Sequence, residues 1–255
     1  MVNHMSATVR LVFGDAREWR YIVASLAALV DEASFTIDAM GMRLRALDPS
    51  RIAMVDFNLP ASAFEEYQCE EEVKIGVNFD ELNRVMKRGR ADERVVLEVV
   101  GGRLKITMVG KAERSFSLPV IDIAGEELPL PKLNFTVRAK MLSDTLKDAI
   151  KDAELVSDSV SFEAREEYLK LAARSDKGNV EVKFTLESGS LIDYEVDEPS
   201  RSTYPISYLS DMLKGATNLS DIANIEFATD KPLLLSFELA GGGRLSYFLA
   251  PRLES

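Results

Sequence analysis

The sequence predicts an α+β protein of two similar halves, with helices on one face of mostly antiparallel sheets. Two observations support this fold class. Stretches with apolar residues at helical spacing alternate with stretches in which polar and apolar residues alternate. The order of these stretches recurs at an offset of 125 to 128 positions, as in Ser34 with Ser159 and Glu98 with Glu226. A fixed order at one offset indicates an internal duplication. The same patterns divide each half into two rounds of strand, helix and three strands.

The first half opens with a helix whose apolar face begins at Trp19, and Asp15 is suited to cap its start. A turn of two glycines, Gly101-Gly102, joins the last two strands of this half. The expected elements are, in order, a helix at 19–30, strands at 35–38, 42–47 and 52–59, a helix bearing Phe79, Leu82, Val85 and Met86, and strands at 95–100 and 103–109.

The second half retraces this order, and Gly241-Gly242-Gly243 is expected to turn between its last two strands. The expected elements are a helix at 142–153, strands at 160–164, 168–173 and 180–186, a helix at 206–213, and strands at 225–228, 233–239 and 245–249.

A proline-containing linker at 119–134 separates a domain at 1–118 from a domain at 135–255. Three prolines and a glycine disfavour a regular helix in this linker. It is nevertheless rich in apolar side chains, among them Leu128 and Leu130, whereas a passive spacer would be more polar. Such a linker either lies on the body of the protein or receives a partner, and the sequence favours neither.

Composition excludes several classes of protein and site. The 255 residues contain one cysteine, Cys69, and one histidine, His4, so neither an intrachain disulfide nor a Cys/His zinc site is expected. No apolar run is long enough to span a membrane, and no leader peptide is apparent. We therefore expect a reducing intracellular compartment. The net charge of −11 argues against nucleic acid as a partner, unless the positive charge is segregated.

Eight of the 31 basic residues occupy one kind of position on the expected helices. Each helix has a polar face opposite its apolar face, and these four polar faces carry eight basic residues: Arg17, Arg20, Arg84, Lys87, Arg88, Lys147, Lys151 and Lys214. For a single helix, a solvated face with ion pairs is the simpler interpretation, and Asp144, Asp148 and Asp152 lie beside the third set. Because repeated helices share one side of a molecule, however, their charges would sum into one field that attracts a polyanion.

An enzyme is the remaining alternative from the residues themselves. Paired carboxylates such as Asp38 with Asp48, or Asp56 with Glu98, would suit a hydrolase or a magnesium site. All four lie in strand patterns where cross-strand charge or exposure explains them. Nucleotide-binding glycine motifs are missing, and Cys69 has no histidine to activate it. We therefore predict no catalytic residue, no metal and no cofactor.

Three stretches resemble the proliferating cell nuclear antigen (PCNA) family of sliding clamps, in its archaeal form. They are Leu44–Ile52 leading to Phe64–Tyr67, Gly76–Leu82 leading into the basic helix at Arg84–Arg88, and the ending Tyr247–Pro251. The similarity in order and spacing covers essentially the whole chain. It implies two clamp-type domains, each a duplicated β-α-β-β-β unit, with helices on the inner face of a three-subunit ring and antiparallel sheets outside.

The resemblance implies a function without catalysis. Duplex DNA, encircled and not read by sequence, would pass the inner helices. Arg20, Arg84, Lys87, Lys151 and Lys214 match positions where such clamps place basic residues, and helix phase adds Arg17, Arg88 and Lys147. Subunits would join through two sheet edges, at Glu113, Arg114, Ser115, Phe116 and Leu118 and at Gly178, Val180, Val182 and Phe184.

The family also tethers DNA polymerase, the clamp loader, flap endonuclease and DNA ligase through short Gln-x-x-hydrophobic-x-x-aromatic-aromatic peptides. The matching pocket positions are Leu47, Arg51, Ile52, Leu128, Leu130, Phe135, Pro232, Phe248, Ala250 and Pro251. The resemblance leaves open whether the ring contains one chain or several, so a heterotrimeric or checkpoint-type clamp is an alternative. It implies a cytoplasmic, chromosome-associated protein, or a nuclear one in a eukaryote.

Overall fold

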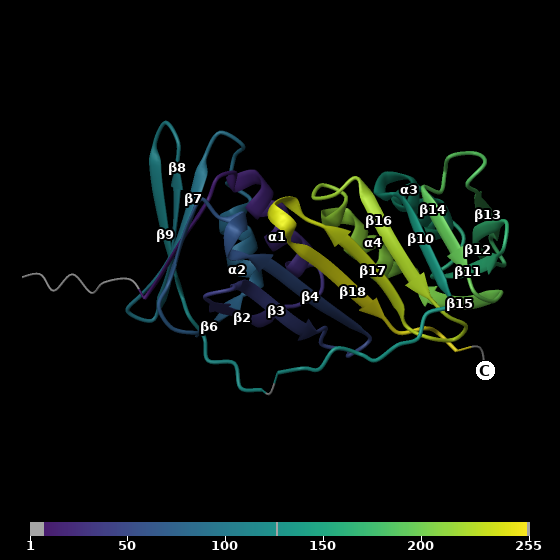
Figure 1. Ribbon diagram of the computed structural model, residues 1–255, viewed down its shortest axis with the longest axis horizontal. Coiled ribbons are helices and arrows are strands. Elements are labelled where there is room, and N and C mark those ends of the chain that lie inside the picture. Colours follow the sequence, from purple (N-terminus) through teal and green to yellow (C-terminus); the bar gives the residue numbers. More distant parts are fainter. Residues whose placement is uncertain (1–7, 126, 254–255) are drawn as a thin grey trace, which may run out of the picture. The chain divides into compact units, whose positions relative to one another are not determined.

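The computed structural model describes residues 8–125 and 127–253, so His4 lies outside the described residues (Figure 1). Four rounds of strand, helix and three strands follow one another along this part of the chain, as the sequence predicts. Two short strands, β5 (Glu66–Cys69) and β14 (Asp193–Val196), are inserted before the second and fourth rounds. The predicted α+β fold class and the internal duplication are confirmed.

The four helices of the described residues lie where the apolar periodicity predicts them. Asp15 caps the first helix by accepting hydrogen bonds from the amides of Arg17 (2.8 Å) and Glu18 (3.2 Å), and Asn78 caps the second by accepting from the amide of Glu81 (3.0 Å). The helices are α1 (Ala16–Ala27), α2 (Phe79–Met86), α3 (Ser143–Glu154) and α4 (Ile206–Ala216).

The chain forms two compact units whose boundaries cross the linear sequence. The first comprises the chain up to Pro49, Asp56–Leu128 and Leu239–Arg244, and the second comprises Ser50–Val55, Pro129–Glu238 and the chain from Leu245 onward. The expected linker at 119–134 is therefore divided between them. Its residues up to Leu128 pack with the first unit, and those from Pro129 with the second.

Antiparallel strands form two layers in the first unit. One is a sheet in the order β5-β1-β7-β8-β9, and the other is a run of strands in the order β4-β3-β2-β6. Their bounds are β1 (Val9–Phe13), β2 (Glu32–Asp38), β3 (Gly41–Leu47), β4 (Ala53–Pro60, in this unit from Asp56), β6 (Val73–Asn78), β7 (Arg94–Val100), β8 (Arg103–Val109) and β9 (Glu113–Pro119). Helices α1 and α2 pack against each other, and α2 also contacts β9.

The second unit repeats this arrangement. One run of strands has the order β14-β10-β16-β17-β18, and a sheet has the order β13-β12-β11-β15. Their bounds are β10 (Val137–Leu142), β11 (Ser159–Arg165), β12 (Tyr168–Ser175), β13 (Gly178–Phe184), β15 (Ser200–Pro205), β16 (Ile222–Phe227), β17 (Leu233–Glu238) and β18 (Arg244–Leu249). Helix α3 packs against α4 and contacts β13.

Each unit has its own aromatic core. In the first, Phe35 lies between Trp19, Phe57 and Phe79, with ring centroids 5.7 to 6.3 Å apart. In the second, Phe162 packs edge-on against Tyr204 (5.4 Å) and Phe227 (5.9 Å). The corresponding Phe35 and Phe162 lie on β2 and β11, the strands that follow α1 and α3, so the duplication extends to the packing of the core.

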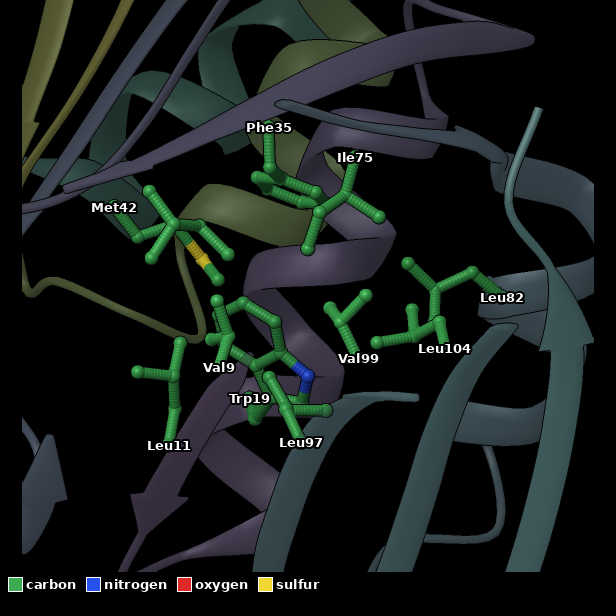
Figure 2. Close-up of a pocket in the computed structure, with 11 residues that line it drawn as sticks. Val9, Leu11, Trp19, Phe35, Met42, Ile75, Leu82, Leu97, Val99 and Leu104 are labelled. Atoms are coloured by element: carbon green, nitrogen blue, oxygen red, sulfur yellow. The ribbon is translucent and has the colours of Figure 1, made fainter. Parts of the chain in front are cut away.

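A small cavity of about 20 Å³ lies beside Trp19 in the first unit (Figure 2). Apolar side chains from both layers line it, including Val9, Phe35, Ile75 and Leu97. The indole Nε1 of Trp19 has no hydrogen-bond partner among the described residues. A cavity of this size holds at most one water, and a water needs two or more polar partners. The cavity is therefore a packing defect and not a ligand site.

The structure differs from the predicted elements at several places. Helix α1 ends at Ala27, so Leu29 and Val30 are buried in the following turn and not in the helix. The predicted hairpin at Gly101-Gly102 is confirmed, with φ of 57° and 73° at the two glycines. The expected glycine turn between the last two strands is confirmed, with φ of 75° and 83° at Gly241 and Gly242, within a short helical turn at 240–242. Strands β1, β5, β6, β10, β14 and β15 were not predicted; they are four to six residues long, which is too short for alternation alone to distinguish them from extended connections.

Candidate functional site

Five of the eight predicted basic residues belong to the first unit: Arg17 and Arg20 lie on α1, Arg84 lies on α2, and Lys87 and Arg88 lie in the turn that follows α2 and not on the helix as predicted. Arg84, Lys87 and Arg88 are exposed, and within residues 8–125 and 127–253 none of the three side chains forms an ion pair. Arg20 is half-buried, with its guanidinium 5.3 Å from the centre of the Tyr21 ring. Arg17 is half-exposed and pairs with Asp15 at 3.4 Å. The first unit therefore has a largely uncompensated cationic face.

The second unit carries the other three basic residues on α3 and α4. Lys214 is exposed, and Lys151 is exposed and 4.0 Å from Asp148. Lys147 is half-buried, and its Nζ donates a hydrogen bond of 3.3 Å to Oγ1 of Thr217 just beyond α4. Lys147 thus bridges the two helices of this unit, which limits how far its charge can reach toward a ligand.

Two carboxyl groups on these helices protonate more readily than usual. Burial raises the pKa of Glu18 on α1, and the neighbouring charge of Asp15 raises it further. Burial likewise raises the pKa of Asp211 on α4, with a further contribution from Glu154 and an opposing one from Lys214.

Two seven-residue edge strands carry the residues predicted to join subunits. Strand β9 ends the order β5-β1-β7-β8-β9, and β13 ends the order β13-β12-β11-β15. On β9, Arg114, Phe116 and Leu118 are half-buried and alternate with exposed residues, among them Glu113 and Ser115. On β13, Gly178, Val180 and Val182 are half-buried and alternate with exposed residues. Both edges therefore present backbone groups and partly exposed apolar side chains.

Two of the predicted interface side chains face inward instead. Phe184 is 2% exposed, because it belongs to the core of the second unit, so its side chain is not available at the edge. Arg114 donates hydrogen bonds to both carboxylate oxygens of the buried Glu93 (2.6 and 2.7 Å) and to the carbonyl of Arg88 (3.1 Å). This arginine ties the edge strand β9 to the end of α2, a role that the sequence pattern did not reveal.

The linker is fixed to the first unit at two places. The amide of Ile121 donates a hydrogen bond of 2.9 Å to the carbonyl of Gly76 on β6. A Cβ atom at Gly76 would lie 2.1 Å from the carbonyl oxygen of Ile121, so only glycine allows this approach. Further along, Nη1 of Arg45 donates to the carbonyl oxygen of Leu128 at 2.7 Å. The linker therefore contacts the body of the protein at Ile121 and at Leu128, and its role in receiving a partner stays a prediction.

The predicted partner pocket consists of side chains that are all at least partly accessible. Arg51 is exposed and has an unusual positive φ of 59°. Ile52 and Leu130 are 39% and 46% exposed, which is high for large apolar residues. The half-buried members are Leu47, Leu128, Phe135, Pro232, Phe248, Ala250 and Pro251. Within the second unit, the structure brings Ile52 and Ala250 together, because the amide of Ala250 donates to the carbonyl of Ile52 at 2.9 Å.

Three of the four carboxylates considered for catalysis pair with arginines, and the fourth, Asp48, is buried at 5% exposure. Asp38 pairs with Arg43, whose hydrogen bond holds the pKa of that carboxyl below its usual value. Asp56 pairs with Arg45 at 2.8 Å, and Glu98 pairs with Arg10 at 3.1 Å. Burial raises the pKa of the Cys69 thiol, which argues against a reactive thiolate. Among the described residues, no cluster of three or more His, Cys, Asp or Glu could hold a metal ion.

Comparisons with known proteins agree with this arrangement. The family model for the N-terminal domain of proliferating cell nuclear antigen matches residues 10–123, and the C-terminal domain model matches residues 129–252. The chain belongs to the PCNA family. A DNA polymerase sliding clamp from Thermofilum pendens is 53% identical over 246 residues, covering 96% of this chain and all of that protein.

Solved PCNA structures agree as well. PCNA from Thermococcus kodakaraensis is 36% identical, with a TM-score of 0.91 over 96% of this chain and all of that one. The PCNA2–PCNA3 complex from Sulfolobus tokodaii is 33% identical, with a TM-score of 0.89 over the same shares. The predicted archaeal type of clamp is confirmed, and so is the prediction that the protein is a processivity factor and not an enzyme. No helix within the described residues has the length and apolar character to cross a membrane.

Proposed function

We propose that this PCNA-family chain closes into a ring of three copies around duplex DNA, with β9 of one subunit pairing with β13 of the next. The proposal rests on which of the sheets' edge strands are covered by other segments of the chain and which are left open. The end of β6 is covered by the linker through Ile121, and β15 by the C-terminal segment, because the amide of Arg252 donates to the carbonyl of Thr203 at 2.7 Å.

The other ends of the strand orders differ in length. Strands β5 and β14 have four residues each, whereas β9 and β13 have seven each. A long open edge on a soluble protein is a hazard unless it is paired. Two different edges that complement each other give a head-to-tail interface, which closes into a ring when the rotation allows it.

The cationic helices support the choice of DNA as the encircled ligand. In a protein of net charge −11, eight basic residues lie on the four helices or in the turn directly after α2. A clamp that slides needs a diffuse positive field and no tight contacts to individual phosphates or bases, because each tight contact adds to the salt-dependent cost of leaving. Encirclement then keeps the ring on DNA while every local contact stays weak. We infer that the protein acts on the chromosome.

The partner surface is proposed from the accessible apolar residues. Peptides of DNA polymerase, the clamp loader, flap endonuclease and DNA ligase would insert a hydrophobic side chain and aromatic rings among Leu128, Leu130 and Phe248. Exposed apolar side chains such as Ile52 and Leu130 support an interaction surface. Phe248→Ala is expected to weaken stimulation of a polymerase in primer extension without changing the mass of the ring. Unchanged stimulation would remove Phe248 from the proposed pocket.

Measurement of the molar mass in solution tests the ring directly. The purified chain is expected at about 85 kDa, three times its 28.3 kDa. Val180→Asp with Val182→Asp on β13 is expected to give a folded monomer, because charged side chains would face the apolar part of the joining strand. A mixed ring is the second candidate, favoured by the likeness to the PCNA2–PCNA3 complex. A chain that is monomeric alone and assembles only with a related chain would support the mixed ring.

A further inference from the structure

Arg45 makes two hydrogen bonds that join a strand to the linker. Its Nε donates to Oδ1 of Asp56 at 2.8 Å, and its Nη1 donates to the carbonyl oxygen of Leu128 at 2.7 Å. The side chains of Arg45 and Asp56 are 24% and 26% exposed, so both contacts are partly shielded from water. Arg45 lies on β3 on the face opposite the buried Met42 and Leu44.

The guanidinium group is suited to this double role. Its donors lie in a rigid plane, so fixing one of them on Asp56 also fixes the direction in which the others point. Asp56 lies on β4, which is in the same layer of the first unit as β3. It therefore fixes the guanidinium group of Arg45 from a strand and not from the linker itself. A hydrogen bond from a charged donor is also stronger than one between neutral groups. Lysine at this position could reach one acceptor but could not reproduce the fork.

The sequence around the anchored carbonyl is stiff. Leu128-Pro129-Leu130-Pro131 alternates leucine with proline. Each proline fixes its own φ and restricts the residue before it to extended conformations. Holding the carbonyl of Leu128 therefore restricts the direction in which the next residues leave the first unit. Leu128 and Leu130 are the two linker side chains proposed above to contact a partner peptide, and Leu130 is 46% exposed.

We propose that Arg45 is a positioning residue for partner binding: held by Asp56, it fixes the Leu128 carbonyl and so presents Leu128 and Leu130 to the hydrophobic side chain of a bound peptide. This inference rests on the proposed peptide-binding function. Arg45 itself need not touch the peptide, since both of its observed contacts are within the first unit. Without the Arg45 contacts, the linker samples other directions. The affinity for the peptide then falls in proportion to the fraction of time that the linker still spends in the binding-competent direction.

Arg43 offers a matched control on the same strand and the same face. It pairs with Asp38 and Glu72 and attracts Glu127 of the linker through space, but no hydrogen bond to the linker is seen from it in the described residues. Arg43→Gln therefore removes the same charge from β3 without removing a linker hydrogen bond. Arg45→Gln removes the charge and also the hydrogen bond to the linker. Arg45→Lys retains the charge but not the fork, and Asp56→Asn leaves Arg45 in place with a weaker partner.

The test measures the affinity of each full-length variant for a fluorescent peptide of the form Gln-x-x-Leu-x-x-Phe-Phe, by anisotropy. Trypsin cleavage after the exposed Lys132 reports linker mobility in the same samples. Arg45→Gln is expected to bind about tenfold more weakly than the wild type and to be cleaved faster. Arg45→Lys and Asp56→Asn should fall between them, and Arg43→Gln should match the wild type in both measurements.

Three outcomes would overturn the inference. They are equal affinity of Arg45→Gln and the wild type, an equal loss in Arg43→Gln and Arg45→Gln, and weaker binding without faster cleavage. If Arg45→Gln does not fold, the comparison of Arg45→Lys and Asp56→Asn with the wild type decides, because both keep a donor near Leu128. Failure of the wild type to bind the peptide at all would instead refute the proposed peptide-binding function.

Discussion

The contact between Glu93 and Arg114 is the strongest candidate for a single ion pair that holds the first unit together. Glu93 follows α2 and precedes β7, and its side chain is 8% exposed. Its carboxylate accepts hydrogen bonds from Arg114 on β9 and from the amide of Arg90 (3.0 Å), while its backbone carbonyl accepts from the amide of Ala16 (2.9 Å) at the start of α1. One residue thus connects both helices of the unit with the edge strand.

The expected cost of Glu93→Gln follows from these contacts. Glutamine keeps the size of the side chain but loses the charge, and its amide group would place donors against the donors of Arg114 and Arg90. Removing one partner of a fully buried ion pair costs about 3–5 kcal/mol. Arg114 is 27% exposed, so water can partly solvate it, and we expect about 2 kcal/mol in the free energy of unfolding. For a chain of this length, that lowers the melting temperature by about 4–8 °C.

Urea unfolding and thermal melts of the two variants Glu93→Gln and Glu70→Gln provide the comparison. Glu70 lies in the same unit, just after β5, and is exposed, so its variant should stay within about 0.5 kcal/mol of the wild type. If Glu93→Gln were as stable as Glu70→Gln, the ion pair would contribute nothing measurable, and the view of Arg114 as the tie between β9 and α2 would be wrong.

Three further predictions follow from the charges and the linker. Lys87→Glu with Lys214→Glu should reduce retention of the clamp on circular DNA while leaving its mass unchanged. The control variant, Lys111→Glu with Lys177→Glu, changes the same charge at exposed turn positions and should be retained like the wild type. Equal retention of the two double variants would refute the DNA-facing role. Asp38→Asn should flatten the loss of stability that urea unfolding shows as the pH falls below about 4, the ordinary aspartate pKa. The folded-state pKa of Asp38 is lowered, first by the hydrogen bond from Arg43, so its stabilisation is present above the ordinary pKa and is lost as the pH falls through the folded value; an unchanged pH profile would contradict this. Gly76→Ala should release the linker from β6 and speed trypsin cleavage after Lys132, because the added Cβ would clash with Ile121. Gly125→Ala is the control, since a Cβ there would have no atom within 4 Å, and its cleavage should match that of the wild type. Equal cleavage of the two variants would refute the anchor at Gly76.

Much of the fold follows from the spacing of apolar residues along the sequence. The four helices have strong periodicity and recognisable caps, as Asp15 and Asn78 show, and the offset between the halves reveals the duplication. The missed strands are those whose pairing is decided by distant partners. Strand β1, for example, pairs with β5 and β7, which lie more than 50 residues further along the chain, and its five residues alone do not distinguish a strand from an extended leader.

The site was predicted less completely, because single residues there depend on contacts between distant segments. Alternation along β3 places Arg43 and Arg45 on the polar face, but nothing local shows that only Arg45 reaches the linker. The resemblance selects the strand of Phe184 for the interface without showing that this side chain turns inward, so only its backbone is left to serve the predicted edge contact. Glu93 and Gly76 were missed for the same reason, as their partners lie 21 and 45 residues away in sequence.

The two units differ in the cationic face that they contribute, and the difference bears on how a clamp can slide. Exposed Arg84 on α2, and Lys87 and Arg88 in the turn after it, have no acidic partner within the described residues, whereas on α3 Lys151 lies near Asp148 and Lys147 is held by Thr217. If DNA passes these helices, most of the attraction comes from the first unit of each subunit, and the second adds a weaker, partly neutralised field. In the proposed ring, three stronger and three weaker stretches of positive charge would favour brief contacts that change as the duplex turns. Each stretch could be weak without loss of the DNA, because release from the proposed ring would require opening of the β9–β13 contacts and not dissociation from phosphates.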